Sequence, residues 1–181
     1  MSTDGLKRLT LDDIEASLRA DLEPTVARLG YFGEFFQVFS AVPGAVQGFM
    51  AYTKAVKSPL ADSENEVLAL AVCTALGDSY ERIQHERLSL KLGLDLNWIA
   101  AAEGRDGADM SLLNSNETAL RTLALAMLTQ FGKGCQHHIA DAAAIIGPQK
   151  AAAALLQITR FTSIATLCNA LALTLPVPSV F

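Results

Sequence analysis

The most informative part of the chain, residues 63–93, reads SENEVLALAVCTALGDSYERIQHERLSLKLG. Ser63 and Glu66 stand three residues apart ahead of an apolar run, which is the pattern of a capping box at a helix start. Gly77 interrupts the apolar run, and Asp78 follows it as a residue type that caps helices. A closing glycine ends the second helical segment. The stretch therefore predicts a helical hairpin.

Two titratable side chains of this hairpin share one helical face. Glu81 and His85 are four residues apart, so their side chains are neighbours on the helix surface. A carboxylate beside an imidazole can orient the ring and form an acid/base pair near neutral pH. Glu66 lies one helix earlier, and a turn at Gly77 can bring its carboxylate to the same place. We therefore take His85, Glu81 and Glu66 as the candidate catalytic residues.

The rest of the chain also predicts helices. Ala- and Leu-rich segments have apolar residues three and four apart, and alternation of period two is missing. The predicted helices cover residues 11–21, 24–39, 43–56, 97–102, 117–131 and 149–175. Thr10 is the expected cap of the first helix, a break is expected near Thr159 in the last, and residues 104–115 are the expected loop. The predicted fold class is all-α.

Composition narrows the possible functions. The 181 residues correspond to about one domain, since a domain averages roughly 150 residues. A content of 51% hydrophobic and 18% charged residues excludes a disordered protein. The net charge is −5 and Lys and Arg do not cluster, so a small-molecule or protein partner is expected rather than nucleic acid or a membrane. Charges within the first fifteen residues argue against a secretory signal and predict a cytoplasmic protein.

Several other features are expected to be structural. The uncharged stretches 35–53 and 161–181 contain prolines and polar residues, so we expect buried helices rather than membrane spans. Three cysteines occur, Cys73, Cys135 and Cys168. They form no Cys-x-x-Cys, which disfavours both a disulfide framework and a thiol-based metal site. His137 and His138 are adjacent on a predicted helix and should point about 100° apart, so no metal site is expected.

A family resemblance rests on the hairpin. A Glu opening a buried helix, a tight turn, Tyr-Glu-x-x-x-His and a closing Gly resemble the carboxymuconolactone decarboxylase family, which includes the alkyl hydroperoxidase D proteins. The match runs from Glu66 to Gly93, with weaker likeness on both sides. The resemblance implies an alkyl hydroperoxidase D-like all-α bundle with the hairpin at the site, a homotrimer or homohexamer, and no cofactor. Residues 1–30 would then be an N-terminal helical extension and residues 31–181 the family-like domain.

The chain departs from the peroxidase branch of that family. The Cys-x-x-Cys of that branch falls here on Asp78 and Glu81, which leaves no thiol pair to attack a peroxide. The decarboxylase branch resembles this chain at Tyr80, Glu81 and His85. Tyr80 and Asp78 are accordingly expected to bind substrate. The alternatives are that Asp78 and Glu81 form a helix capping box and that Tyr80 is a packing aromatic.

Three functions follow, in order of preference. The first is a cofactor-free acid/base enzyme that decarboxylates a small carboxylated lactone or related acid. In this scheme His85 protonates the anion left by loss of carbon dioxide, Glu81 holds His85, and Glu66 tunes or relays. The second is an alkyl hydroperoxidase or peroxiredoxin-type antioxidant activity, which would have to use single cysteines. The third is a non-catalytic oligomeric protein that binds a small molecule.

Overall fold

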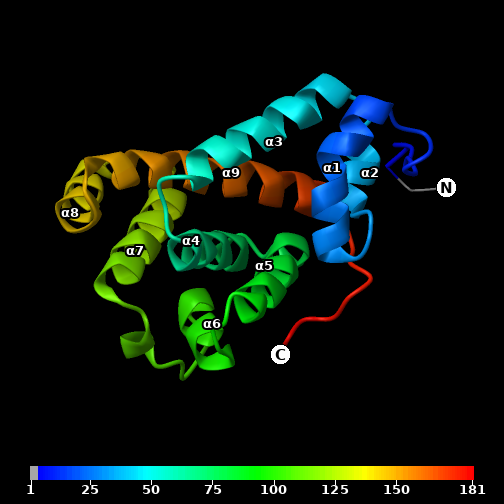
Figure 1. The fold of residues 1–181 in the computed structure, drawn as a ribbon. Coiled ribbons are helices and arrows are strands. Elements are labelled where there is room, and N and C mark those ends of the chain that lie inside the picture. Colours follow the sequence, from blue (N-terminus) through cyan, green and yellow to red (C-terminus); the bar gives the residue numbers. More distant parts are fainter. Residues whose placement is uncertain (1–3) are drawn as a thin grey trace.

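The computed structural model describes residues 4–181, which form nine α-helices, one short 3₁₀ helix and no strand (Figure 1). The elements are α1 (Ala16–Leu29), α2 (Glu34–Phe39), α3 (Pro43–Lys57), α4 (Asp62–Ala75), α5 (Ser79–Lys91), α6 (Leu96–Glu103), the 3₁₀ helix η1 (Met110–Leu112), α7 (Ser115–Gln130), α8 (Gln136–Ile146) and α9 (Pro148–Ala170). Helix α9 runs between α3 and α4, while α1 and α2 gather at one end of the molecule and α8 at the other (Figure 1). The all-α prediction is confirmed.

Helix α4 is the centre of the fold. Ten consecutive residues, from Glu64 to Cys73, are buried, and α5, α6, α7 and α9 all contact this helix. A helix covered on every side needs apolar residues on every face, which the run VLALAVC supplies. The same run begins next to Glu66, a carboxylate that is also buried. A buried carboxylate requires a partner, because its desolvation is otherwise unfavourable.

The turn between α4 and α5 brings the two helices together as a hairpin. Gly77 has a φ of +67°, a left-handed conformation that glycine adopts without a Cβ clash. The N–H of Asp78 donates to the carbonyl of Cys73 at 2.8 Å, which closes the turn. Asp78 Oδ1 then accepts the N–H groups of Tyr80 at 2.9 Å and Glu81 at 3.4 Å. The predicted hairpin and its cap at Asp78 are confirmed.

The start of α4 differs from the prediction. The capping pair Ser63 and Glu66 is wrong, because Glu64 is the residue that reaches back, and its Oε2 accepts the N–H of Ala61 at 2.7 Å. Lys150 Nζ binds the same carboxylate at 2.8 Å. The reason is spacing: the helix begins two residues earlier than expected, at Asp62, so Glu64 occupies its third position. Glu66 lies farther along the helix and takes no part in capping it.

The N-terminal helix also differs from the predicted 11–21. Thr10 does not cap it, since the Thr10 N–H and hydroxyl both donate to Asp13 Oδ2, at 2.8 and 2.9 Å, in a local turn. Pro24 lies inside α1 instead of opening a new helix. Apolar residues of α1 buried against α3 hold this helix in place despite the missing proline N–H. The predicted helix over 24–39 is therefore replaced by the end of α1 and by α2.

Helix α9 is continuous, so the predicted break near Thr159 is wrong, and the helix ends before residue 175. The Thr159 hydroxyl donates to the carbonyl of Leu156 at 2.8 Å, which satisfies it within the helix. By length and composition α9 is apolar enough to cross a membrane, and half of its most apolar window is buried inside the fold. Its contacts with α3, α4 and α8 account for that composition. The absence of a membrane partner stays a prediction.

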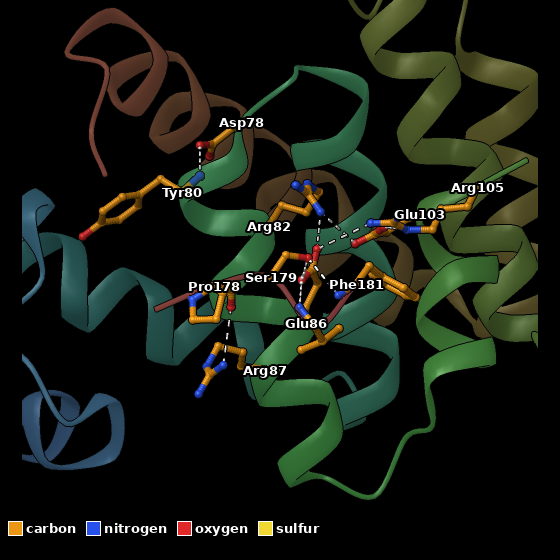
Figure 2. Close-up of polar contacts among 11 residues, drawn as sticks. Asp78, Tyr80, Arg82, Glu86, Arg87, Glu103, Arg105, Pro178, Ser179 and Phe181 are labelled. Carbon is orange, nitrogen blue, oxygen red and sulfur yellow. Dashed lines mark hydrogen bonds and ion pairs between the residues drawn. The ribbon is translucent and has the colours of Figure 1, made fainter. Parts of the chain in front are cut away.

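The segment after α9 returns to α5 and covers a buried carboxylate (Figures 1 and 2). Glu86 is fully buried, and its Oε2 accepts the hydroxyl of Ser179 at 2.6 Å and the N–H of Val180 at 3.0 Å. Its Oε1 pairs with Arg82 and lies 3.9 Å from Arg105 Nη2. Figure 2 shows this cluster on a different side of α5 from Tyr80. The cluster ties the C-terminal segment to α5 and to the loop after α6.

Candidate functional site

A pocket of about 460 Å³ opens between α5, α9 and the N-terminal helices α1, α2 and α3. This volume lies in the range of about 300–1,000 Å³ that small-molecule sites occupy. Much of its wall is apolar and includes Phe35, Phe36, Phe49, Met50, Phe161 and Ile164. Polar and charged side chains from α1, α3, α4, α5 and α9 also line the pocket. The pocket therefore combines apolar surface with many polar groups, among which the groups around His85 contact one another.

The three predicted catalytic residues meet in this pocket. Glu66 Oε2 lies 2.7 Å from His85 Nδ1, and Glu81 Oε2 lies 3.8 Å from His85 Nε2. The Glu66 side chain is 1% exposed and the His85 side chain 15% exposed, so the ring and the Glu81 side chain reach solvent while Glu66 does not. An ionised carboxylate only accepts hydrogen bonds, so with Glu66 ionised the contact requires a proton on Nδ1. The other ring nitrogen, Nε2, is then available to take up or release a proton.

Glu81 is directed toward His85 and not toward the start of its helix. A full capping box would need Glu81 to accept the Asp78 N–H, but that N–H donates to Cys73. Instead, Glu81 Oε1 accepts Gln84 Nε2 at 3.2 Å, and its other oxygen faces the imidazole. Asp78 caps α5 alone. The capping-box alternative therefore accounts for Asp78 and leaves Glu81 free for chemistry.

The two predicted substrate-binding residues have different positions. Tyr80 lines the pocket, and its hydroxyl accepts the N–H of Phe35 at 3.1 Å. Gly33 permits this approach, since a Cβ there would lie 2.7 Å from the Tyr80 hydroxyl. Burial raises the pKa of Tyr80, which keeps the phenol protonated. Asp78 lies outside the pocket lining, buried at the start of α5.

Burial of Asp78 makes stability depend on pH. Burial and the nearby Glu81 carboxylate raise the pKa of Asp78 from 3.8 to about 6, and its Oδ2 has no hydrogen-bond partner. The folded state then holds the Asp78 proton more tightly than the unfolded state does. The free energy of unfolding therefore falls as pH rises through the interval from 3.8 to about 6.

We expect Asp78→Asn to remove this pH dependence, because asparagine caps the helix equally well without ionising. The free energy of unfolding of the variant relative to wild type should rise by about 2 kcal/mol between pH 4.5 and pH 7.5. Urea unfolding at the two pH values measures it. A relative stability that stays constant across this interval would show that Asp78 titrates normally in the folded protein.

Two pocket residues of α9, Arg160 and Gln157, were not anticipated from the sequence. Arg160 of α9 enters the pocket, and its Nε donates to the Thr53 hydroxyl at 2.9 Å. Its guanidinium lies 4.4 Å from the centroid of the Phe161 ring, and His85 contacts the same ring edge-on at 5.1 Å. Burial lowers the pKa of Arg160, while Glu81 raises it. The signal available in the sequence was a single charge in the apolar stretch 151–170, with Gln157 three residues before it.

The cysteines lie apart from the pocket lining. Cys73, Cys135 and Cys168 are all buried and free. Burial raises the pKa of Cys73 and Cys168, so their reactive thiolate forms are disfavoured. This geometry gives no cysteine direct access to a substrate beside His85.

The adjacent histidines differ from the expectation. His137 and His138 do not diverge, because their ring centroids lie 3.9 Å apart. Rotation about the side-chain bonds offsets the angle between neighbouring helix positions. Among residues 4–181, no group of three or more His, Cys, Asp or Glu side chains is placed to hold a metal ion.

Comparisons with known proteins place the fold. No protein-family model matches the sequence, and no curated protein matches it. A solved structure from Ralstonia eutropha, an uncharacterized peroxidase-related protein with an alkylhydroperoxidase AhpD core, is similar with a TM-score of 0.76 and 16% identity. The similarity covers 90% of this chain and 87% of that one.

A second solved structure is a cysteine-to-alanine variant of the debrominase Bmp8 in complex with 2,3,4-tribromopyrrole. It is similar with a TM-score of 0.80 and 16% identity, over 94% of this chain and 90% of that one. At such identities the likeness shows the fold alone. The chain therefore has the AhpD-like all-α fold, with a pocket beside its central hairpin.

Proposed function

We propose that this protein is a cofactor-free acid/base enzyme that decarboxylates a small carboxylated lactone or related acid. The observation that carries the proposal is the line from Glu66 through His85 to Glu81 in a pocket of small-molecule size. A buried carboxylate, an imidazole and a partly exposed carboxylate make up a proton-transfer site. The same proposal includes assembly as a homotrimer or homohexamer and a cytoplasmic location. It also includes a boundary near residue 30 between an N-terminal extension and the family-like domain.

The proposed reaction begins with cleavage of the bond between the substrate carbon and its carboxylate. Carbon dioxide leaves, and the electron pair stays on the substrate as a delocalised enolate-like anion. His85 Nε2–H delivers a proton to that carbon, so one proton is consumed for each carbon dioxide formed. The hydrogen bond from Nδ1–H to Glu66 orients the ring and stabilises its protonated form. Glu81, partly exposed beside Nε2, returns a proton from solvent.

The positions of the cysteines favour this proposal over the antioxidant alternative. A hydroperoxidase needs an accessible thiolate, whereas the three thiols here are buried and lie outside the pocket lining. Acid/base chemistry needs only groups that line the pocket. The activities named for the two similar structures belong to those proteins. For this chain, the positions of the thiols are the reason for preferring decarboxylation over hydroperoxide reduction.

The first test is carbon dioxide release from a panel of small carboxylated lactones, measured at several pH values. Wild type should release carbon dioxide from at least one member, and a variant with all three cysteines changed to alanine should retain that activity. The same two proteins should leave hydroperoxides unreduced in the presence of a thiol reductant. Far-UV circular dichroism checks that the cysteine variant is folded.

Two results would overturn the proposal. Hydroperoxide reduction that disappears in the cysteine variant would establish the antioxidant function. Saturable binding of panel members without turnover, unaffected by Glu81→Gln, would indicate a non-catalytic binding protein. Each result assigns the chain to a different one of the three candidate functions.

A further inference from the structure

We infer that α9 carries a subsite for an α-hydroxy acid, formed by Arg160 and Gln157. The subsite itself does not depend on the proposed function. Only the statement of which end of the ligand lies toward His85 rests on that function. The inference concerns two side chains that line the pocket and that each hold one buried polar atom without a hydrogen-bond partner, Arg160 Nη1 and Gln157 Oε1. Arg160 and Gln157 are three residues apart, so their side chains leave α9 on the same helical face.

Arg160 is a fixed cation that makes no direct ion pair with a described residue, although the Glu81 and Glu66 carboxylates lie near enough to raise its pKa. Its Nε donates to Thr53, whose own hydroxyl donates to the carbonyl of Phe49, so the guanidinium is held at one edge. Its faces lie 4.4 Å from the ring centroid of Phe161 and 5.4 Å from that of Phe49. No carboxylate among residues 4–181 lies within ion-pair distance of Arg160, and its buried Nη1 has no acceptor. A desolvated guanidinium of this kind is best satisfied by an anionic oxygen of a ligand.

Gln157 presents an acceptor because its neighbours fix the direction of its amide. Asn65 Nδ2 donates to the carbonyl of Ala61 at 3.0 Å, which leaves Asn65 Oδ1 as an acceptor. Gln157 Nε2 donates to that oxygen at 3.0 Å. Gln157 is 2% exposed, and its Oε1 is left without a partner. A ligand group that satisfies Oε1 must donate a hydrogen bond.

The subsite lies within reach of the proton-transfer residues. His85 and the guanidinium of Arg160 contact the same Phe161 ring, at 5.1 and 4.4 Å from its centroid. Since both distances are measured to one centroid, the imidazole centre and the guanidinium carbon lie within about 9.5 Å of each other. A ligand with one small ring can span any separation up to that limit. The carboxylate then binds Arg160, the α-hydroxyl donates to Gln157, and the remainder extends toward His85.

Binding of unreactive probes tests the subsite without requiring turnover. The probes are both enantiomers of mandelate, phenylacetate without the hydroxyl, O-methylmandelate with the donor blocked, and mandelamide without the charge. Isothermal titration of wild type should show the better mandelate enantiomer binding about fivefold or more tightly than phenylacetate or O-methylmandelate. It should bind about tenfold or more tightly than mandelamide.

Two variants separate the roles of the two residues. Arg160→Leu should weaken mandelate and phenylacetate alike, by about 10- to 100-fold, because both carry the carboxylate. Gln157→Met should weaken mandelate about fivefold and leave phenylacetate unchanged. Arg160→Lys keeps the charge without the planar fork and should give an intermediate loss. Arg121→Leu is the matched control, since this partly buried arginine donates to the carbonyl of Ala102 outside the pocket and should not alter probe binding.

The outcomes distinguish this inference from the proposed function. Equal binding of mandelate, phenylacetate and mandelamide to wild type would overturn the subsite even if no variant folds. Equal weakening of mandelate and phenylacetate by Gln157→Met would also overturn it, because the loss would then be structural. If the probes bind as expected while no lactone releases carbon dioxide, the subsite stands and the proposed function fails.

Discussion

Replacing His85 by asparagine should reduce turnover by about a hundredfold or more without unfolding the protein, because general acid/base catalysis contributes roughly 10²- to 10⁴-fold. Asparagine can still hydrogen-bond to Glu66, but it cannot take up and release a proton near neutral pH. The loss should appear in kcat more than in KM, since the ring is proposed to act on the departing anion and not to anchor the substrate. Steady-state carbon dioxide release measures both constants.

His137→Asn is the matched control for this substitution. His137 is exposed on α8 and does not line the pocket, so its replacement should leave kcat unchanged. Glu66→Gln should reduce turnover by a smaller factor, because the amide oxygen can still accept Nδ1–H but lacks the charge that stabilises the protonated ring. Unchanged turnover in His85→Asn would remove His85 from the mechanism.

Replacing Glu86 by alanine should cost about 3 kcal/mol of unfolding free energy. Breaking a buried charge cluster by removing one partner typically costs about 3–5 kcal/mol. The lower end applies because Glu103 remains beside both Arg82 and Arg105, at 3.6 Å from Arg82 Nη1 in the intact cluster. Burial raises the pKa of Glu103, and the adjacent Glu86 raises it further, so removing Glu86 favours the charged form of Glu103.

Urea unfolding at neutral pH measures the loss, and hydrogen exchange adds a local readout. The Val180 N–H donates to Glu86, so this amide should exchange faster in Glu86→Ala. Glu86→Gln should cost less, since its amide oxygen keeps an acceptor for the C-terminal segment. Glu23→Ala, at an exposed position of α1, should change stability by no more than about 0.5 kcal/mol. A Glu86→Ala protein as stable as wild type would show that the cluster contributes no net stability.

Rules based on local sequence spacing predicted the structure correctly where the two interacting residues lie within a few positions of each other. The cap at Asp78, the turn at Gly77 and the shared face of Glu81 and His85 depend on spacing along one helix or turn, and the structure shows all of them. The same rules failed at the N-terminus of α4, where the helix starts two residues earlier than predicted and Glu64 takes the place expected for Glu66. They also failed at Pro24, where packing against α3 outweighs the cost of proline in a helix.

The site needed contacts between residues far apart in the chain. The sequence could name Glu66 as a carboxylate that a turn might return to His85, but only the crossing of α4 and α5 sets the separation of 2.7 Å. A binding role for Arg160 and Gln157 was still harder to predict from the sequence, because it depends on which of their polar atoms remain without a hydrogen-bond partner after folding.

The sequence by itself determined the all-α class, the central hairpin and the absence of a Cys-x-x-Cys at the site, because helix periodicity, turn residues and residue identity are local properties. Tertiary structure alone decided that α9 delivers a cation to the pocket and that the C-terminal segment covers Glu86. Those arrangements depend on how helices distant in sequence pack together. Burial then decides which polar groups find partners within the protein and which are left for a ligand.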